Sequence, residues 1–265
     1  MTVAEALAEA ERRLTAAGVA TPRVDAELLV GHVLGVTRTQ VHADRGRSID
    51  ADAVEPLLRR RERREPLAYV LGEWGFRRLT LRTDERALVP RPETEVVVER
   101  ALALIADLDA PRVLDVGTGS GAIALALADE HPGARVTGVD TSAAALELAA
   151  ENAALLGLGV ELRRAGVEAA EQAEWDLVVS NPPYVDPDDL ANLQPEVRHE
   201  PRAALADEGL HEELARRAQT TWLVLEVGDG QSDRVIGIVR ELGYDDVRTT
   251  RDLAGTERVI EGRRR

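Results

Sequence analysis

From residue 93 onward, short apolar segments rich in Val, Leu and Ile alternate with segments of helical spacing. Nearly continuous apolar strands that alternate with helices are typical of a parallel sheet covered by helices on both faces. The sequence therefore predicts an α/β domain. The predicted strands are 112–116, 135–140, 160–164, 175–180, 221–227, 246–251 and 257–262, and the predicted helices are 93–107, 121–130, 142–156 and 231–242.

The residues directly after the strands are the candidate site residues, because ligands of such sheets bind beyond the carboxyl ends of the strands. A glycine-rich loop follows the strand 112–116, and glycines at alternate positions allow a tight turn and a close approach of the backbone to a ligand. The strand 135–140 ends in Asp140, whose carboxylate can accept both hydroxyls of a ribose. The predicted cofactor-binding residues are thus Gly117, Thr118, Gly119, Ser120, Gly121 and Asp140.

Two kinds of cofactor fit this loop, a nicotinamide dinucleotide and S-adenosylmethionine. The dinucleotide fingerprint places its third glycine one residue later than Gly121 stands here. S-adenosylmethionine has no phosphate but carries an ammonium and a sulfonium, so an acid such as Asp115 beside the loop is useful. Asp115 fits equally well as a carboxylate that bonds to the backbone. The glycine spacing favours S-adenosylmethionine.

A second polar cluster, Asn181-Pro182-Pro183-Tyr184, follows the strand 175–180, which chain order places beside 112–116. Two prolines give a stiff bend whose carbonyls are not drawn into a helix. The Asn181 side chain and the Pro182 carbonyl can accept both N–H bonds of a planar NH2 group, and Tyr184 offers a flat wall. An amide or an adenine amine fits, and holding its nitrogen in line with a methyl group supplies much of the acceleration.

Asn181 and Pro182 are therefore the predicted catalytic residues. The predicted substrate-binding residues are these two together with Pro183 and Tyr184. Asn181 is also predicted to border the cofactor, because its strand is expected beside the glycine loop.

The N-terminal part has a different character, and residues 2–72 are predicted to be helical. The first helix stops at Gly18, the second runs from Pro22 to Gly35, and a third begins at Asp50 or Asp52. The arginine-rich run 59–64 is interpreted as a solvated helix face rather than a contact patch. The predicted domains are a helical domain 1–72, a hairpin linker 73–92 and the α/β domain 93–265.

Composition excludes several function classes. The chain of 265 residues has no cysteine, and all 33 of its basic residues are arginine, which rules out thiol and lysine chemistry. Its net charge of −15 disfavours general nucleic-acid binding. The five histidines lack metal-ligand spacing, so no metal site is predicted. No apolar run is long enough to span a membrane and the N-terminus does not look like a signal peptide, so a cytoplasmic location is expected.

The chain resembles the PrmC/HemK family, the glutamine-N5 methyltransferases of peptide-chain release factors. The resemblance implies a Rossmann-like, class I S-adenosylmethionine-dependent methyltransferase whose helical N-terminal domain docks a class 1 release factor. It also implies that Gly117 to Gly121 and Asp140 hold the cofactor, and that Asn181 to Tyr184 hold the glutamine amide of the Gly-Gly-Gln loop. The segments that carry it include "PLAYVLG" (66–72), "LVPRPETE" (88–95), "VLDVGTGSGAIALALA" (113–128), "VTGVD" (136–140), "VVSNPPYV" (178–185), "VRHEPRAAL" (197–205) and "GYDDV" (243–247).

Two segments depart from the family pattern. Gly166-Val167 stands where an acid and an aromatic residue are usual near the adenine, and the segment 210–221 is short. Two other functions are therefore weighed. An adenine-N6 DNA or RNA methyltransferase shares "NPPY", but it needs a basic groove for a flipped base. The second alternative function is that of a non-catalytic binding protein that kept the fold.

Overall fold

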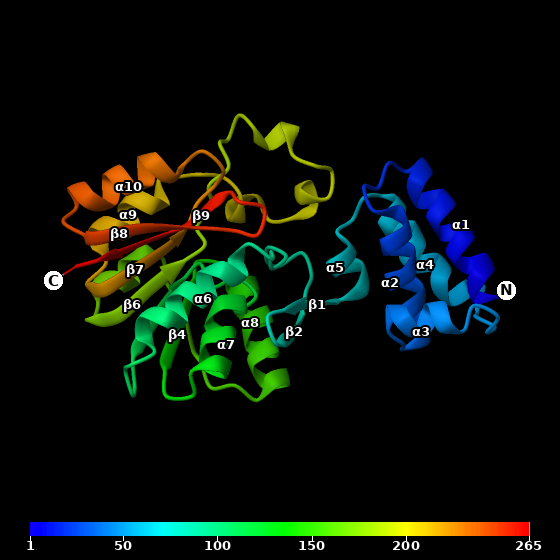
Figure 1. The fold of residues 1–265 in the computed structure, drawn as a ribbon, viewed down its shortest axis with the longest axis horizontal. Helices are drawn as coiled ribbons and strands as arrows, with labels where there is room; N and C mark the ends of the chain where they lie inside the picture. Colours follow the sequence, from blue (N-terminus) through cyan, green and yellow to red (C-terminus); the bar gives the residue numbers. More distant parts are fainter. Residues whose placement is uncertain (265) are drawn as a thin grey trace. The chain divides into compact units, whose positions relative to one another are not determined.

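The computed structural model describes residues 1–264, which form two compact units (Figure 1). The first unit consists of Met1–Glu73 and the short segment Gln194–His199. The second consists of Trp74–Leu193 and the chain from Glu200 onward. In the part of the chain that the structure describes, no helix has the length and apolar character needed to cross a bilayer.

The first unit is a small helical bundle whose helix ends follow local sequence signals. Thr2 caps the first helix in a capping box with Glu5, Pro22 opens the second, and Gly35 ends it in the left-handed conformation. Apolar residues on the inner faces, such as Leu14 and Leu29, form its core. The helices are α1 (Val3–Ala16), α2 (Pro22–Leu34), α3 (Arg38–Ala43), α4 (Ala51–Glu62) and α5 (Leu67–Leu71), of which α3 and α5 were not predicted individually.

The arginine-rich run at the end of α4 is a solvated face only in part: Arg59 and Arg63 are exposed, but the interpretation is wrong for Arg61 and Arg64. The Arg61 side chain is 6% exposed and bonds to Asp25 at 2.7 Å and to Glu196 at 2.8 Å. Arg64 bonds to both carboxylate oxygens of Glu196. Burial by itself raises the pKa of Glu196, but the hydrogen bonds from Arg64 and Arg61 outweigh burial and lower the pKa to about 2. The run therefore fastens the segment Gln194–His199 to the helical unit.

The second unit contains a seven-stranded sheet with the order β5-β4-β3-β6-β7-β9-β8 within the described residues. The first five strands of this order pair in parallel, as the sequence predicts. Strand β9 is antiparallel to both of its neighbours, so the expectation of a wholly parallel sheet is wrong at this edge. The strands are β3 (Arg112–Val116), β4 (Arg135–Asp140), β5 (Glu161–Arg164), β6 (Trp175–Ser180), β7 (Thr220–Glu226), β8 (Asp245–Arg251) and β9 (Glu257–Arg263).

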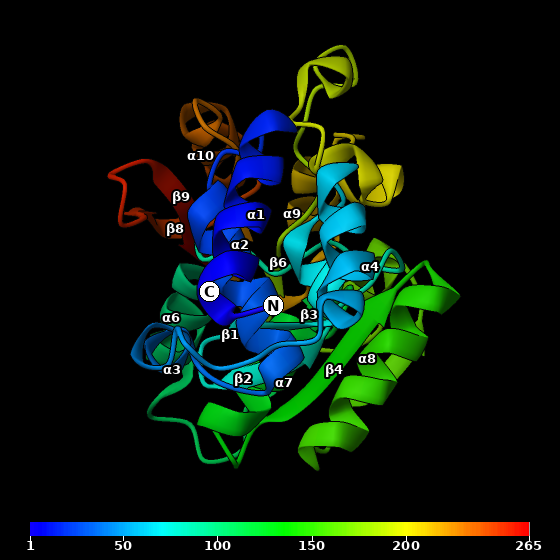
Figure 2. The ribbon, with the colours of Figure 1, turned by 90° about the vertical axis from the view of Figure 1, so that its right-hand side faces the viewer.

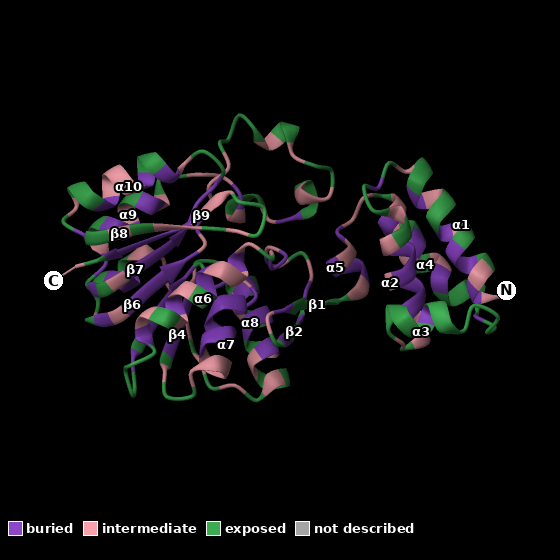
Figure 3. Ribbon diagram, in the orientation of Figure 1, coloured by how far each residue is buried: buried purple, intermediate pink, exposed green. Residues whose placement is uncertain are grey.

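Helices cover both faces of this sheet, as Figure 2 shows. On one face α6 (Thr94–Ile105), α7 (Ala122–Glu130) and α8 (Ala143–Leu156) pack on alternate strand residues such as Val113. On the other face α9 (Leu210–Arg217) and α10 (Ser232–Glu241) pack on the intervening residues. The central strands are buried, whereas the edge strands β5 and β8 and the outer faces of the helices are exposed or half-buried (Figure 3).

A two-stranded sheet, β1 (Glu73–Phe76) and β2 (Leu79–Arg82), lies within the predicted linker. Phe76, Leu79 and Leu81 join the core of the second unit, so the pair is packed against the α/β unit. The predicted domain boundaries themselves stay a prediction. Short 3₁₀ turns that the sequence did not indicate complete the chain: Val167–Glu171, Leu190–Asn192, Val197–His199 and Arg202–Ala204.

Candidate functional site

The glycine loop after β3 is built as a cradle. Gly117 and Gly121 both have positive φ, at 75° and 84°, which residues with a Cβ adopt only with strain. A Cβ on Gly117 would meet open space, so this glycine leaves room for a ligand against the backbone. A Cβ on Gly121 would lie 3.0 Å from Leu125, so this glycine lets α7 begin close to the loop. The two glycines therefore serve different purposes.

Asp115, in β3, stabilises the glycine loop through hydrogen bonds. It is completely buried, and one carboxylate oxygen accepts hydrogen bonds from the Thr118 hydroxyl at 2.6 Å and from the Ala124 N–H at 3.2 Å. The other oxygen, Oδ1, has no hydrogen-bond partner among the described residues. Burial raises the pKa of Asp115 to about 7. Of the two interpretations left open for Asp115, these contacts fit the backbone-bonded carboxylate.

Asp140 stands at the carboxyl end of β4 and remains partly exposed. Its two oxygens accept the N–H groups of Gly119 at 2.9 Å and Ser142 at 2.9 Å. Each carboxylate oxygen keeps a further lone pair for a ribose hydroxyl. Asp140 thus lies against the glycine loop, and its role in cofactor binding stays a prediction.

The segment that departs from the family pattern offers an acid from a different position. Gly166 N–H donates to Glu168 Oε1 at 2.8 Å, and Glu168 Oε2 lies 2.7 Å from where a Cβ on Gly166 would stand. The Thr141 methyl is 3.5 Å from the same point. The hydrogen bond from the Gly166 N–H lowers the pKa of Glu168. A carboxylate therefore occupies the place of a side chain on residue 166, next to the residue that follows Asp140.

The two predicted clusters lie at the same edge of the sheet. Strands β3 and β6 pair in parallel with Val116 opposite Ser180, so the glycine loop and Asn181 leave neighbouring strand ends. The Ser180 hydroxyl donates to the Val116 carbonyl at 2.7 Å and locks the two ends together. The predicted neighbourhood of the two strands is confirmed.

Asn181 belongs to a chain of hydrogen bonds that the sequence did not suggest. Its Nδ2 donates to the Thr94 hydroxyl at 3.2 Å, and that hydroxyl donates to Glu226 Oε2 at 2.7 Å. Thr94 is the first residue of α6, and Glu226 is the last residue of β7. The Tyr184 hydroxyl lies 3.5 Å from the other oxygen of Glu226.

Glu226 is fully buried under this chain. Burial raises its pKa to about 7, and the hydrogen bond from Thr94 and the charge of Arg258 only partly oppose this. Burial also raises the pKa of Tyr184 to about 12, and the charge of Glu226 adds to this effect. His211 lies behind, with Nε2 at 2.8 Å from the Glu226 carbonyl, and burial lowers its pKa.

The Tyr184 ring packs against Gly228, and the Tyr184 main-chain carbonyl accepts a hydrogen bond from Gln231. A Cβ on Gly228 would come within 3.0 Å of Tyr184 Cδ2. Gln231 donates to the Tyr184 carbonyl at 2.8 Å and accepts from the Gly228 N–H at 3.1 Å. The loop after β7 therefore fixes one side of the predicted substrate wall.

Glu200 joins two segments that carry the family resemblance. It is buried, accepts the Val89 N–H at 3.0 Å and forms an ion pair with Arg91. Burial raises the pKa of Glu200, and the charge of Arg91 opposes the rise. Because Thr94 lies three residues beyond Arg91, this contact also anchors the entry to α6.

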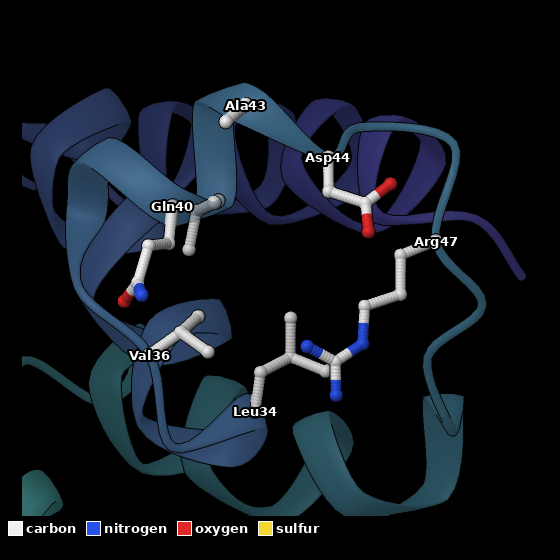
Figure 4. Close-up of a pocket in the computed structure, with 7 residues that line it drawn as sticks. Leu34, Val36, Gln40, Ala43, Asp44 and Arg47 are labelled. Carbon is white, nitrogen blue, oxygen red and sulfur yellow. The ribbon is translucent and has the colours of Figure 1, made fainter.

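A hollow elsewhere does not contribute to this site. Figure 4 shows it in the helical unit, with apolar Leu34 and Val36 below and polar Asp44 and Arg47 at its rim. Within residues 1–264 no group of three or more His, Cys, Asp or Glu side chains could hold a metal ion. Of the candidate site residues, the glycine loop, Asp140, Asn181 and Glu226 lie at the carboxyl ends of β3, β4, β6 and β7.

Sequence reasoning missed Thr94, Glu226 and Glu168. A signal existed for Glu226, because it interrupts the apolar run "LVLEV" at the end of a strand. Thr94 lies within "VPRPETE", but nothing local distinguishes its hydroxyl from that of an ordinary first-turn residue. Glu168 is an exposed acid whose significance depends on the missing side chain at Gly166.

The residues present fit S-adenosylmethionine. The open space at Gly117 accepts a ligand against the loop, and Asp140 stands beside it with spare lone pairs. Fold and site together define a class I S-adenosylmethionine-dependent methyltransferase. Residues 5–72 match the family model described as the PrmC N-terminal domain, and residues 98–222 match the methyltransferase small domain.

The chain belongs to the release factor glutamine methyltransferase family. A relative with that name from Deinococcus radiodurans is 42% identical, with 100% of this chain and 99% of the relative covered. Another from Caulobacter vibrioides is 38% identical, with 99% of this chain and 96% of the relative covered. The solved structure of the hMettl16 catalytic domain in complex with a 3′UTR hairpin has a TM-score of 0.56 and 16% sequence identity. The match covers 92% of this chain and 80% of that chain, and at this identity it shows a shared fold alone.

Proposed function

We propose that this protein methylates the side-chain amide nitrogen, N5, of the glutamine in the Gly-Gly-Gln loop of class 1 peptide-chain release factors. The observation that carries the proposal is the placement of Asn181 beside the glycine loop, on neighbouring parallel strands. The full-length relatives named release factor glutamine methyltransferase support this acceptor over an adenine amine. The net charge of −15 also opposes a nucleic-acid substrate.

In this proposal Gly117, Thr118, Gly119, Ser120 and Gly121 hold the cofactor together with Asp140, and Asn181 borders it. When bound, S-adenosylmethionine supplies an electrophilic methyl group. Asn181 and the Pro182 carbonyl accept the two N–H bonds of the glutamine amide, while Pro183 and Tyr184 flank its plane. Positioning does most of the work, since no side chain has to act as a strong base.

The helical unit is proposed to dock the release factor, and the protein is proposed to act in the cytoplasm. The match of residues 5–72 to the PrmC N-terminal domain supports an N-terminal unit distinct from the methyltransferase part. The predicted division into 1–72, 73–92 and 93–265 expresses the same assignment, with the hairpin as linker.

The test is methyl transfer from labelled S-adenosylmethionine to a purified release factor. We expect label on the Gly-Gly-Gln glutamine, located by peptide mass spectrometry, and no label on a release factor with that glutamine replaced by alanine. Label on DNA or RNA adenine, and none on the release factor, would overturn the proposal in favour of the adenine-N6 alternative. Cofactor binding without transfer to any acceptor would favour a non-catalytic protein.

A further inference from the structure

The hydrogen-bond chain from Asn181 through Thr94 to Glu226 determines which way the Asn181 amide faces. A threonine hydroxyl has one proton to donate and lone pairs to accept with. An ionised Glu226 can only accept, so the Thr94 proton points to Glu226 Oε2, at 2.7 Å. The Thr94 oxygen can then only accept a hydrogen bond, and it accepts one from Asn181 Nδ2 at 3.2 Å.

We propose that Thr94 and Glu226 are positioning residues that fix the Asn181 amide with its Oδ1 directed to the acceptor amide; this rests on the proposed function. If the Asn181 amide were turned over, its Oδ1 would face a hydroxyl oxygen whose proton is already donated, and the two oxygens would repel. The turned amide would also present N–H groups to the glutamine N–H groups. The network therefore selects the one orientation in which Asn181 acts as an acceptor.

The selection depends on the charge of Glu226. A protonated Glu226 can donate to Thr94, which frees the threonine proton to point at Asn181 and removes the preference between the two amide orientations. The titratable groups near Glu226 are Arg258 of β9, Glu93 before α6, the Tyr184 hydroxyl after β6 and His211 of α9. His211 binds the Glu226 main-chain carbonyl, and burial lowers its pKa. Arg258 is partly neutralised by Asp252 at 3.3 Å, so it does not keep Glu226 ionised at all pH values. Because burial raises the pKa of Glu226 to about 7, the switch between the two states falls near neutral pH.

The experiment measures kcat, KM and cofactor affinity with a release factor as substrate. We expect Thr94→Val, which keeps the shape but removes the hydroxyl, to lower kcat roughly 10- to 100-fold with cofactor affinity within about twofold. Thr94→Ser, which restores a hydroxyl, should recover kcat to within about threefold. Thr137→Val is the matched control, because Thr137 is another buried threonine that bonds a glutamate, Glu161, away from the network.

The pH profile separates positioning from a general effect on folding. Wild-type kcat should fall as the pH drops below about 7, and Glu226→Gln, which carries no charge, should be nearly flat between about pH 6 and 8. An unchanged acidic limb in Glu226→Gln, or a wild-type kcat in Thr94→Val, would overturn the inference while leaving the function standing. If Thr94→Val fails to fold, the Glu226→Gln profile decides. No transfer by the wild type would instead count against the proposed function.

Discussion

At the scale of single residues, the carboxylates of the candidate site differ in burial and in hydrogen-bond partners. Asp140 ends β4, and Asn181 follows β6, the two strands that flank β3. Asp140 accepts the Gly119 N–H of the glycine loop, whereas Asp115 of β3 is fully buried. This difference in burial explains why Asp115 has a raised pKa while Glu168, which is exposed and bonded to a backbone N–H, has a lowered one.

Replacing Asp140 by alanine should affect cofactor binding, whereas replacing Asn181 by alanine should affect methyl transfer. Asp140→Ala should weaken cofactor binding by about 1–3 kcal/mol, the range for a lost charge-assisted hydrogen bond. Asn181→Ala should lower turnover by roughly 100- to 1,000-fold with little change in cofactor affinity, because its predicted contact is to the acceptor. Calorimetry gives the first quantity and single-turnover transfer the second. Near-normal turnover in Asn181→Ala would remove Asn181 from the mechanism.

Asp115 makes a distinct prediction about stability. Since its pKa is raised to about 7 in the folded chain, the folded state keeps a proton that the unfolded state releases from about pH 4 upward. The free energy of unfolding should therefore fall as pH rises through this window. Asp115→Asn should remove a dependence of up to ~1.4 kcal/mol per pH unit. Urea unfolding at pH 5, 6, 7 and 8 measures it, and parallel curves for the two proteins would contradict it.

At the scale of elements, each functional group stands where an element begins or ends. Strands β3, β4, β6 and β7 deliver the glycine loop, Asp140, Asn181 and Glu226 to one edge, and α6 begins at Thr94. The loop after β7 supports the acceptor motif through Gly228 and Gln231. A change in this loop should thus act on the acceptor side without touching the cofactor side.

Gly228→Ala tests that separation. The added Cβ would lie 2.9 Å from Gln231 Oε1 and 3.0 Å from Tyr184 Cδ2, so the Gln231 amide must shift and the ring must give by a few tenths of an ångström. We expect kcat/KM for the release factor to fall roughly tenfold, with cofactor affinity within about twofold. Gly237→Ala is the control: it lies inside α10 with no atom within 4 Å of its would-be Cβ, and it should stabilise the protein by about 0.5–1 kcal/mol. Equal kinetics for both variants would refute the argument.

At the scale of the whole molecule, the chain after the acceptor motif crosses between units. Residues 186–193 belong to the α/β unit, Gln194–His199 belong to the helical unit, and the chain from Glu200 belongs to the α/β unit again. Glu196 anchors the middle part to Arg61 and Arg64, and Glu200 anchors the return to Val89 and Arg91. Each anchor joins residues more than 100 positions apart in the sequence.

Glu196→Ala should release this segment. The variant removes the acceptor of both arginines and leaves a buried guanidinium of Arg61 with Asp25 as its remaining carboxylate. We expect trypsin to cut after Arg198 several-fold faster than in the wild type, because cleavage follows the population of the opened segment. Glu208→Ala, at an exposed acid of the same chain region, is the control. Mass spectrometry of timed digests reads the result, and equal rates at Arg198 would contradict the anchoring role.

The amino-acid sequence by itself determined the alternation of strands and helices, the first helix caps and the two motifs at strand ends. It could do so because side-chain periodicity and turn chemistry are local, and because parallel strands must present their carboxyl ends at one edge. Only the tertiary structure brought Thr94 to Asn181 and Glu226, placed β9 antiparallel between β7 and β8, and buried Arg61 against Glu196. The hydrogen bonds and the ion pair among these contacts join residues 87 to 135 positions apart, and at such separations no spacing rule relates one partner to the other.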